Sequence, residues 1–419
     1  MFNSLKSDTA FNVLRIKDFQ FYIYARFFVT IGIMMQSVIV GWQVYEITKD
    51  PLALGMIGLA EVMSFLLIAL FGGHIADIYD RKKLILISVF MYFLCCIALL
   101  LLCSHFSFLL KHWGVLPIFI IIFMTGIARS FLAPSQIAFM AQIVPKEQYA
   151  YSATWNSVSW HVASVTGPAI GGLIYGFFGI TKAYVSVAIF ILIGLFFYML
   201  IKKKPMPERQ KSESIFHSLA EGILFVFKNQ IIVGALTLDM FSVLFGGAVA
   251  LLPIFAHDIL KVGPEGLGYL RAAPAVGSVI MSLYLAYYPP LRNSGRKFLI
   301  CMAGFGLSMI LFAISKNFYL SLCILIMSGM FDNMSVIVRS TIIQIYTPDH
   351  MRGRVASVNS IFISSSNELG AFESGLAAKL MRLIPSVIFG GSMTLLVVAL
   401  TSKFAPMLRK LHLSDKINE

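Results

Sequence analysis

The chain has 419 residues, of which 58% are hydrophobic and only 13% are charged. Soluble globular domains carry roughly 25% charged residues, so this composition excludes an ordinary soluble domain and indicates a protein embedded in a lipid bilayer. The formal net charge is +13, but the basic residues are spread over many short polar segments. A nucleic-acid-binding protein gathers its basic residues on one surface, so no nucleic-acid partner is expected.

Apolar runs long enough to cross a bilayer core of roughly 30 Å recur along nearly the whole chain. Lipid cannot satisfy the hydrogen bonds of an open backbone, so each run is expected to form an α-helix. Twelve spans are predicted, at 19–45, 52–75, 84–106, 115–143, 154–177, 183–201, 231–254, 267–288, 298–314, 320–345, 355–380 and 387–404. The sequence therefore predicts an all-α membrane protein.

The longest polar stretch lies in the middle of the chain and divides the spans into two sets of six. Residues 202–229 are rich in lysine, arginine and proline, and we expect them to link a bundle at 1–201 to a bundle at 230–419. Within this linker, residues 214–229 place apolar side chains at helical spacing. That pattern predicts an amphipathic helix lying at the membrane surface.

Two short sequence patterns recur in the second half of the chain. Residues 145–157 resemble residues 348–360, and residues 51–55 resemble residues 264–268. Both pairs lie at equivalent places relative to the predicted spans. The two sets of six helices are therefore expected to be homologous bundles related by an axis along the membrane normal.

Lysine and arginine residues flank the predicted spans unevenly. They are far more numerous at the side that holds both termini and the central linker than at the opposite side. Positively charged loops are retained on the cytoplasmic side of a membrane. We therefore expect a multi-pass membrane protein with both termini in the cytoplasm.

A short, strongly charged segment joins the second and third spans. It reads Gly73-His-Ile-Ala-Asp77-Ile-Tyr-Asp80-Arg81-Lys82-Lys83. A glycine, an aspartate four residues later and a closing run of arginine and lysine resemble the loop between helices 2 and 3 of the major facilitator superfamily. In that superfamily the loop acts as a cytoplasmic latch. The resemblance therefore implies gating roles for Gly73, Asp77, Asp80, Arg81 and Lys82.

The fifth span contains Ala163-Ser-Val-Thr-Gly167-Pro168-Ala-Ile-Gly171-Gly172. This segment resembles the antiporter motif of the same superfamily, which is typical of drug/proton exporters, although the first glycine of the motif is alanine here. A Gly-Pro pair kinks a helix and small residues permit close helix packing. The resemblance implies that Gly167 and Pro168 take part in gating, and ordinary helix packing is the alternative.

The resemblance extends along essentially the whole chain. Residues 40–55, 129–134 and 351–375 look like the bacterial branch of the superfamily that contains enterobactin and macrolide exporters. Membership implies two six-helix bundles around a central cavity, a location in the bacterial inner membrane and secondary transport by alternating access. It does not identify the substrate.

Charged residues inside the spans are costly, and each is a candidate for function. Arg26 and Asp239 occupy equivalent places in the two halves, as do Arg129 and Asp332. In the superfamily these spans line the cavity, so the resemblance implies that all four residues bind substrate. Structural ion pairing is the alternative. It suits Arg26 and Asp239 better, because they lie closer to the cytoplasmic end, where a long arginine reaches the interface.

Carboxylates inside the spans are candidates for proton coupling, because an apolar environment favours the neutral, protonated form. The candidates are Glu61, Asp332, Glu368 and Glu373. Glu368 and Glu373 are five residues apart and lie about 140° apart around a helix. Only one of the two is expected to face the cavity, and the sequence leaves open which one. Arg271 is a possible ion-pair partner of Glu61, so a structural pair remains the alternative there.

We therefore expect a proton-coupled exporter of a siderophore or an amphipathic drug-like compound. Its expected partners are a small-molecule substrate, protons and the lipid bilayer, and a monomer is expected. A lysophospholipid or solute importer or flippase of the same fold stays open, as does a transport-inactive receptor or scaffold. The sequence contains no phosphate loop, Ser/His/Asp set or zinc-ligand spacing, so no enzyme activity, cofactor or metal is expected.

Overall fold

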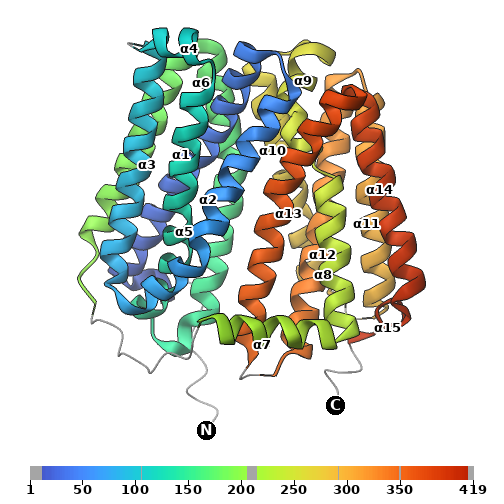
Figure 1. The fold of residues 1–419 in the computed structure, drawn as a ribbon. Helices are drawn as coiled ribbons and strands as arrows, with labels where there is room; N and C mark the ends of the chain where they lie inside the picture. Colours follow the sequence, from blue (N-terminus) through green and yellow to red (C-terminus); the bar gives the residue numbers. More distant parts are fainter. Residues whose placement is uncertain (1–11, 105, 205–214, 291, 349–350, 414–419) are drawn as a thin grey trace. The chain divides into compact units, whose positions relative to one another are not determined.

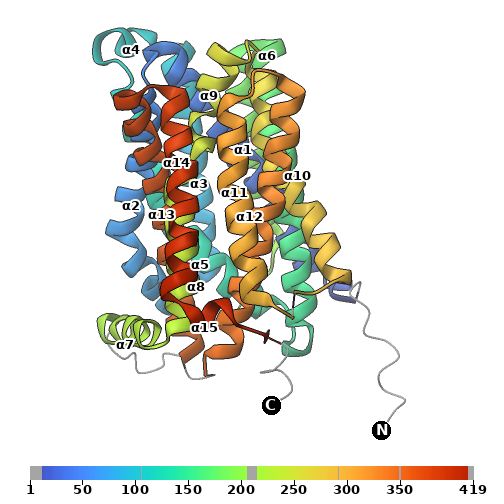
Figure 2. The ribbon, with the colours of Figure 1, turned by 90° about the vertical axis from the view of Figure 1, so that its right-hand side faces the viewer.

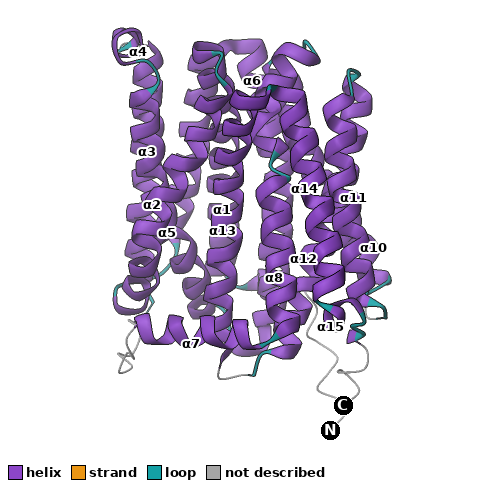
Figure 3. Ribbon diagram, turned by 45° about the vertical axis from the view of Figure 1, so that its right-hand side comes forward, coloured by secondary structure: helices purple, strands orange, loops and turns teal. Residues whose placement is uncertain are grey.

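The structure is a computed structural model that describes residues 12–104, 106–204, 215–290, 292–348 and 351–413 (Figure 1). All the regular secondary structure in these ranges is helical, as Figure 3 shows. The expectation of an all-α fold is confirmed. Each predicted span overlaps helical structure for most of its described length.

The chain divides into two compact units. Unit 1 comprises Met1–Val40 and Met63–Lys211, and unit 2 comprises Gly41–Val62 and Ser212–Glu419. Residues 41–62 therefore belong to the second unit, although they precede the predicted linker. The independence of the predicted bundles at 1–201 and 230–419 stays a prediction.

The helices of the first half of the chain are long. They are α1 (Lys17–Thr48), α2 (Pro51–Ile78), α3 (Arg81–Ser104), α4 (Ser107–Trp113), α5 (Leu116–Ile143) and α6 (Tyr149–Leu200), with short η1 (Asn12–Arg15) and η2 (Lys146–Gln148). The 52-residue α6 contains two predicted spans that meet at Gly179, whose φ of 82° is open to glycine at little steric cost.

The second half begins with the predicted amphipathic helix. The helices are α7 (Ile215–Lys228), α8 (Gln230–Phe245), α9 (Leu252–Ile254), α10 (Pro264–Tyr287), α11 (Ser294–Ile314), α12 (Phe318–Tyr346), α13 (Arg352–Met381), α14 (Leu383–Phe404) and α15 (Pro406–Arg409). A 3-10 helix, η3 (Ala248–Leu251), lies between α8 and α9, and a π-helix, η4 (Phe255–Ile259), follows α9. Within the described ranges, nine segments are long and apolar enough to cross a membrane. The chain is a multi-pass membrane protein.

Polar side chains start several of these helices. Asp80 accepts hydrogen bonds from the backbone N–H of Lys82 at 3.0 Å and of Lys83 at 3.3 Å, which caps α3. Asn229 caps α8 in the same way, through the backbone N–H groups of its first turn. Such caps satisfy N–H groups that have no partner inside the helix. They fix where each span begins.

In unit 1, small residues bring α6 close to α1. A Cβ atom added at Gly167 would lie 2.6 Å from Cβ of Met34, and one at Gly194 would lie 2.8 Å from the carbonyl oxygen of Ala25. Lipid gives no hydrophobic drive for helix association, so close packing of this kind holds the helices together.

Close backbone approach at glycine residues also packs the helices of unit 2. A Cβ atom at Gly277 on α10 would lie 1.9 Å from the carbonyl oxygen of Ile326 on α12. One at Gly391 on α14 would lie 2.7 Å from the carbonyl oxygen of Gly306 on α11. Figure 2 shows α11, α12 and α14 running side by side along the unit.

The helix α7 lies across the ends of α8 and α13 (Figure 1). Val226 is fully buried and joins a core that also holds Ile232 of α8 and Val355 of α13. Glu221 pairs with Arg354, which ties α7 to the first turn of α13. Ile223, Leu224 and Phe227 of α7 are exposed.

The contact at Gly277 gives a test of the packing. We expect Gly277→Ala to lower the free energy of unfolding by about 1–3 kcal/mol, because the added methyl group displaces the backbone of α12. Thermal unfolding in detergent measures the effect. Gly353→Ala is the matched control, since no described atom lies within 4 Å of its Cβ position. Equal melting temperatures for the two variants would contradict the close packing.

Candidate functional site

Unit 2 holds most of the charged residues that lie inside spans. They come from the first turns of α2 and from α8, α10, α12 and α13, and they are Glu61, Asp239, Arg271, Asp332, Arg339, Glu368 and Glu373. The structure sorts them into an ion pair, two separate carboxylates and a three-residue cluster.

The ion pair joins Asp239 on α8 to Arg339 on α12. Arg339 Nη1 donates to Asp239 Oδ2, and Ser335 Oγ donates to Asp239 Oδ1 at 3.3 Å. Both charged side chains are only 5% exposed. Substrate binding by Asp239 stays a prediction, and its engagement with Arg339 fits the structural alternative.

The sequence reasoning assigned no role to Arg339. A signal was present, because Ser335 and Arg339 are four residues apart and therefore share a helix face. Two polar residues on one face inside a span indicate a polar partner on the neighbouring helix. The partner proved to be Asp239.

Asp332 lies near the middle of α12 and is half-buried. Its backbone carbonyl accepts a hydrogen bond from Ser335 at 2.8 Å. Within the described ranges, no hydrogen bond or ion pair reaches its carboxylate from another residue. A charge inside a span without a counter-ion is costly, so this carboxyl is suited to exist in the protonated form.

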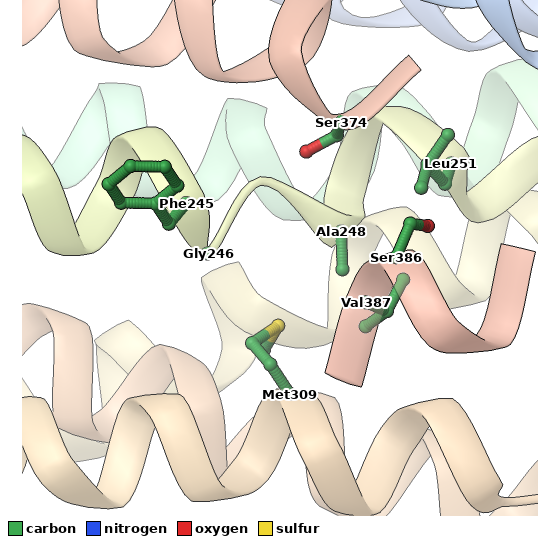
Figure 4. Close-up of a pocket in the computed structure, with 8 residues that line it drawn as sticks. All are labelled: Phe245, Gly246, Ala248, Leu251, Met309, Ser374, Ser386 and Val387. Atoms are coloured by element: carbon green, nitrogen blue, oxygen red, sulfur yellow. The ribbon is translucent and has the colours of Figure 1, made fainter. Parts of the chain in front are cut away.

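Glu373 on α13 is half-buried and forms a side-chain hydrogen bond with Ser374. Ser374 lines a small pocket where α8 ends (Figure 4). The pocket is otherwise formed by Phe245, Gly246, Ala248, Leu251, Met309, Ser386 and Val387. Interrupted helices in transporters leave backbone groups that serve binding sites. Glu373 is the sequence neighbour of Ser374, which lines the pocket at the end of α8.

The cluster joins three helices around Arg271 on α10. The guanidinium of Arg271 interacts electrostatically with Glu61 on α2 and with Glu368 on α13. The structure thus brings Arg271 and Glu61 together as expected. It adds Glu368, which the sequence did not connect with them.

In unit 1, Arg26 belongs to a polar cluster on α1. It donates to the hydroxyl of Tyr22 at 3.4 Å, and Tyr22 donates to the carbonyl oxygen of Gln136 at 3.0 Å. The Gln136 side chain donates to Tyr198 at 2.8 Å. Arg26 therefore borders a buried network that joins α1, α5 and α6. Its role in substrate binding stays a prediction.

Arg129 occupies a different environment on α5. Its side chain is exposed, whereas its neighbours Ala128 and Ser130 are buried. A guanidinium is a rigid fork of donors that matches carboxylate and phosphate groups. Substrate binding by Arg129 is untested.

The basic residues in the first turn of α3 contact the neighbouring helices. Arg81 Nη1 donates to the carbonyl oxygen of Ala138 on α5 at 3.2 Å. Lys82 donates to the carbonyl oxygens of Met199, at 2.9 Å, and Ile201 at the end of α6. A cation at a helix C-terminus is favoured by the helix dipole. Arg81 and Lys82 thus bind three helices of unit 1 together.

The other gating candidates are placed only in part. Gly73 and Asp77 lie in the last turns of α2, in a stretch whose side chains fall outside the described residues. Gly167 and Pro168 are buried inside α6, with Gly167 against Met34 of α1. The gating roles remain predictions, and the contact at Gly167 fits the packing alternative.

Comparison with known proteins shows the kind of protein to which this chain is similar. A family model described as transmembrane secretion effector matches residues 8–418. The enterobactin exporter EntS of Shigella flexneri is 24% identical over 367 residues, which cover 88% of this chain and 86% of the relative. The EntS of Escherichia coli strain HS shows the same identity and coverage. These relatives are transporters, not enzymes.

Solved structures share the fold at low sequence identity. A POT family transporter in complex with 5-aminolevulinic acid has a TM-score of 0.74 at 12% identity, covering 93% of this chain and 96% of the other. A bacterial homolog to the human lysosomal transporter Spinster has 0.71 at 13%, covering 95% and 98%. A D-xylose–proton symporter has 0.71 at 14%, covering 96% and 99%. The expected major facilitator fold is confirmed.

The buried ion pair gives the second test. We expect Asp239→Asn to lower the free energy of unfolding by about 3–5 kcal/mol, because Arg339 is left as an uncompensated buried charge. Unfolding in detergent measures this loss. Adding Arg339→Gln removes the second charge and should restore most of the stability. A stable Asp239→Asn variant with weakened substrate binding would instead support a direct role in binding.

Proposed function

The chain belongs to the transmembrane secretion effector family of the major facilitator superfamily, and we propose that it exports a siderophore or an amphipathic drug-like compound in exchange for protons. The observation that carries the proposal is the Asp332 carboxylate, which lies near mid-span without a described counter-ion. Such a group is stable in an apolar span when it holds a proton and is destabilised when it loses one. That difference is what coupling to a proton gradient requires.

The proposed direction and cargo of transport are supported by similarity to proteins named as exporters. The relatives that match most of this chain carry the printed name enterobactin exporter. The antiporter-like segment around Gly167 and Pro168 is also typical of exporters in the superfamily. We therefore propose export rather than import or lipid flipping. The cargo is carried by alternating access.

This proposal assigns substrate binding and proton coupling to specific residues. Arg129 binds an acidic group of the substrate, because it is an exposed cation inside a span. Arg26 and Asp239 contribute to substrate binding or hold their own units together. Asp332 binds the proton, and Glu373 is the second proton-coupling candidate because it is half-buried beside the break after α8. The protein works as a monomer in the inner membrane, with its termini in the cytoplasm.

The proton-coupling role is tested with purified protein in liposomes, with labelled enterobactin and an amphipathic cationic dye as probes. We expect Asp332→Asn to reduce flux driven by a pH gradient by about tenfold or more, which is a loss of about 1.4 kcal/mol or more. Exchange of probe across the membrane without a gradient should persist, because the amide imitates the protonated carboxyl.

The exposed Glu147 supplies the matched control, since Glu147→Gln also removes a carboxylate but lies outside the spans. Undiminished gradient-driven flux in Asp332→Asn would eliminate the assigned role. Failure of the unaltered protein to move either probe would reject the proposed cargo classes. Uptake in the opposite direction would favour the importer.

Substrate charge is tested at Arg129. We expect Arg129→Ala to weaken binding of an anionic probe about tenfold, which corresponds to about 1.4 kcal/mol, and to leave a cationic probe nearly unaffected. Binding to the purified protein measures both. Arg129→Lys keeps the charge without the planar fork and should lose less. An equal loss for both probes would show that Arg129 has a structural role.

A further inference from the structure

Residues 405–413 fold back onto the start of α11. The backbone N–H of Gly295 donates to the carbonyl oxygen of Leu411 at 3.2 Å, and the backbone N–H of Leu413 donates to Ser294 Oγ at 3.4 Å. Leu413 is fully buried and belongs to the apolar core of unit 2. Figure 2 shows α15 at the lower end of α8, α11 and α14. This segment is therefore a packed part of unit 2.

A close backbone contact fixes the position of the segment. A Cβ atom added at Gly295 would lie 1.7 Å from the carbonyl oxygen of Leu408. Asn293 adopts the left-handed backbone conformation, with a φ of 55°, which asparagine tolerates better than most residues. Its backbone N–H donates to Nδ1 of His412 at 3.2 Å. These contacts set the start of α11 and residues 408–413 at one spacing.

Basic side chains come from both sides of this contact. The cations belong to the start of α11, the end of α14 and the segment after it, and they are Arg292, Arg296, Lys297, Lys403, Arg409 and Lys410. All except Lys297 are exposed. We call these six residues the basic joint. The sequence has no acidic residue from 266 to 331 or from 374 to 414, so the contact gathers like charges without acidic residues among them.

Exposed apolar and aromatic side chains lie next to the basic joint in the chain. Phe404 and Met407, and also Tyr287 and Tyr288 at the end of α10, are each more than half exposed. Nζ of Lys403 lies 5.7 Å from the centroid of the Phe404 ring, which places the charge over an aromatic face. Basic and aromatic side chains together are typical of the level at which lipid headgroups meet acyl chains.

We propose that the basic joint binds the headgroup of an anionic phospholipid. A phosphodiester supplies the negative charge that the six cations lack, and an arginine fork donates to two phosphate oxygens at once. Each Lys or Arg near an anionic lipid surface contributes about fivefold in affinity. The neighbouring aromatic and apolar side chains contact the acyl chains, which a free phosphate ion does not have.

The packing, and not only the number of charges, makes the basic joint a site. Basic segments that only orient a protein in a membrane need no fixed arrangement. Here the contact of Gly295 with Leu408 and the hydrogen bond of Asn293 to His412 hold two charged segments in place. A preformed arrangement lowers the entropy lost on binding. Lipid binding of this kind requires only a membrane protein, so it is independent of the cargo and of proton coupling.

Lipid binding is measured by native mass spectrometry of the full-length protein in detergent, with phosphatidylglycerol or phosphatidylcholine added at equal concentration. The two lipids carry the same acyl chains and differ in net charge. We expect phosphatidylglycerol to bind about tenfold more tightly or better, because it alone is anionic. The preference should fall as ammonium acetate is raised, since salt screens exposed charges. Equal binding of the two lipids overturns the proposal.

Two double variants separate the basic joint from net charge. Arg296→Gln with Arg409→Gln removes one cation from each side of the contact and should lower the preference about fivefold or more. Lys261→Gln with Lys316→Gln is the matched control, because it removes two exposed cations elsewhere in unit 2 and should leave the preference nearly unchanged. An equal loss in both double variants would show a general charge effect and reject the site.

A further variant changes the arrangement without changing any charge. Gly295→Ala places a methyl group against the carbonyl oxygen of Leu408 and should displace residues 405–413, so we expect a similar loss of preference. Gly353→Ala is its control, because no described atom lies within 4 Å of that Cβ position. An unchanged preference in Gly295→Ala shows that the contact is not needed and rejects a built site. The comparison of the two lipids on the unaltered protein remains decisive if a variant fails to fold.

Competition identifies the source of the phosphate. Inorganic phosphate and glycerol phosphate carry the negative charge without acyl chains. If either displaces phosphatidylglycerol at a concentration equal to that of the lipid, the ligand is a free phosphate compound and the lipid proposal is rejected. Binding of phosphatidylglycerol that withstands both competitors supports a lipid site.

Discussion

The cost of placing a charge in an apolar span shapes the arrangement of this protein more than any other constraint. Asp239 meets this cost by pairing with Arg339, both almost fully buried. Arg271 offsets this cost through electrostatic interactions with Glu61 and Glu368, which come from two other helices. Asp332 has no such described partner, and this difference is what separates a carboxylate that fastens helices from one suited to carry a proton.

Close packing at small residues is the second feature that holds the helices together. Helices in lipid gain little from burying apolar surface, so they are held by close backbone approach and by polar contacts. Gly277 against Ile326 and Gly58 against Glu368 both show close backbone approach inside unit 2.

The sequence predicted the helical class, the span positions and the amphipathic α7, because each depends on local composition and spacing. It also suggested the partnership of Glu61 with Arg271, since both are charges buried in apolar runs. It missed the contact of Asp239 with Arg339, because pairing between helices 100 residues apart depends on how two helix faces meet. Periodicity along one helix does not determine that meeting.

By itself, the sequence determined that this chain crosses a membrane many times and that its charges inside the spans demand an explanation. Apolar length and charge cost are local properties, so they can be read residue by residue. Only the tertiary structure decided which charges share a partner and that residues 41–62 join the second unit. Those outcomes follow from packing between distant segments, where a glycine or a carbonyl oxygen on one helix sets how closely another can lie.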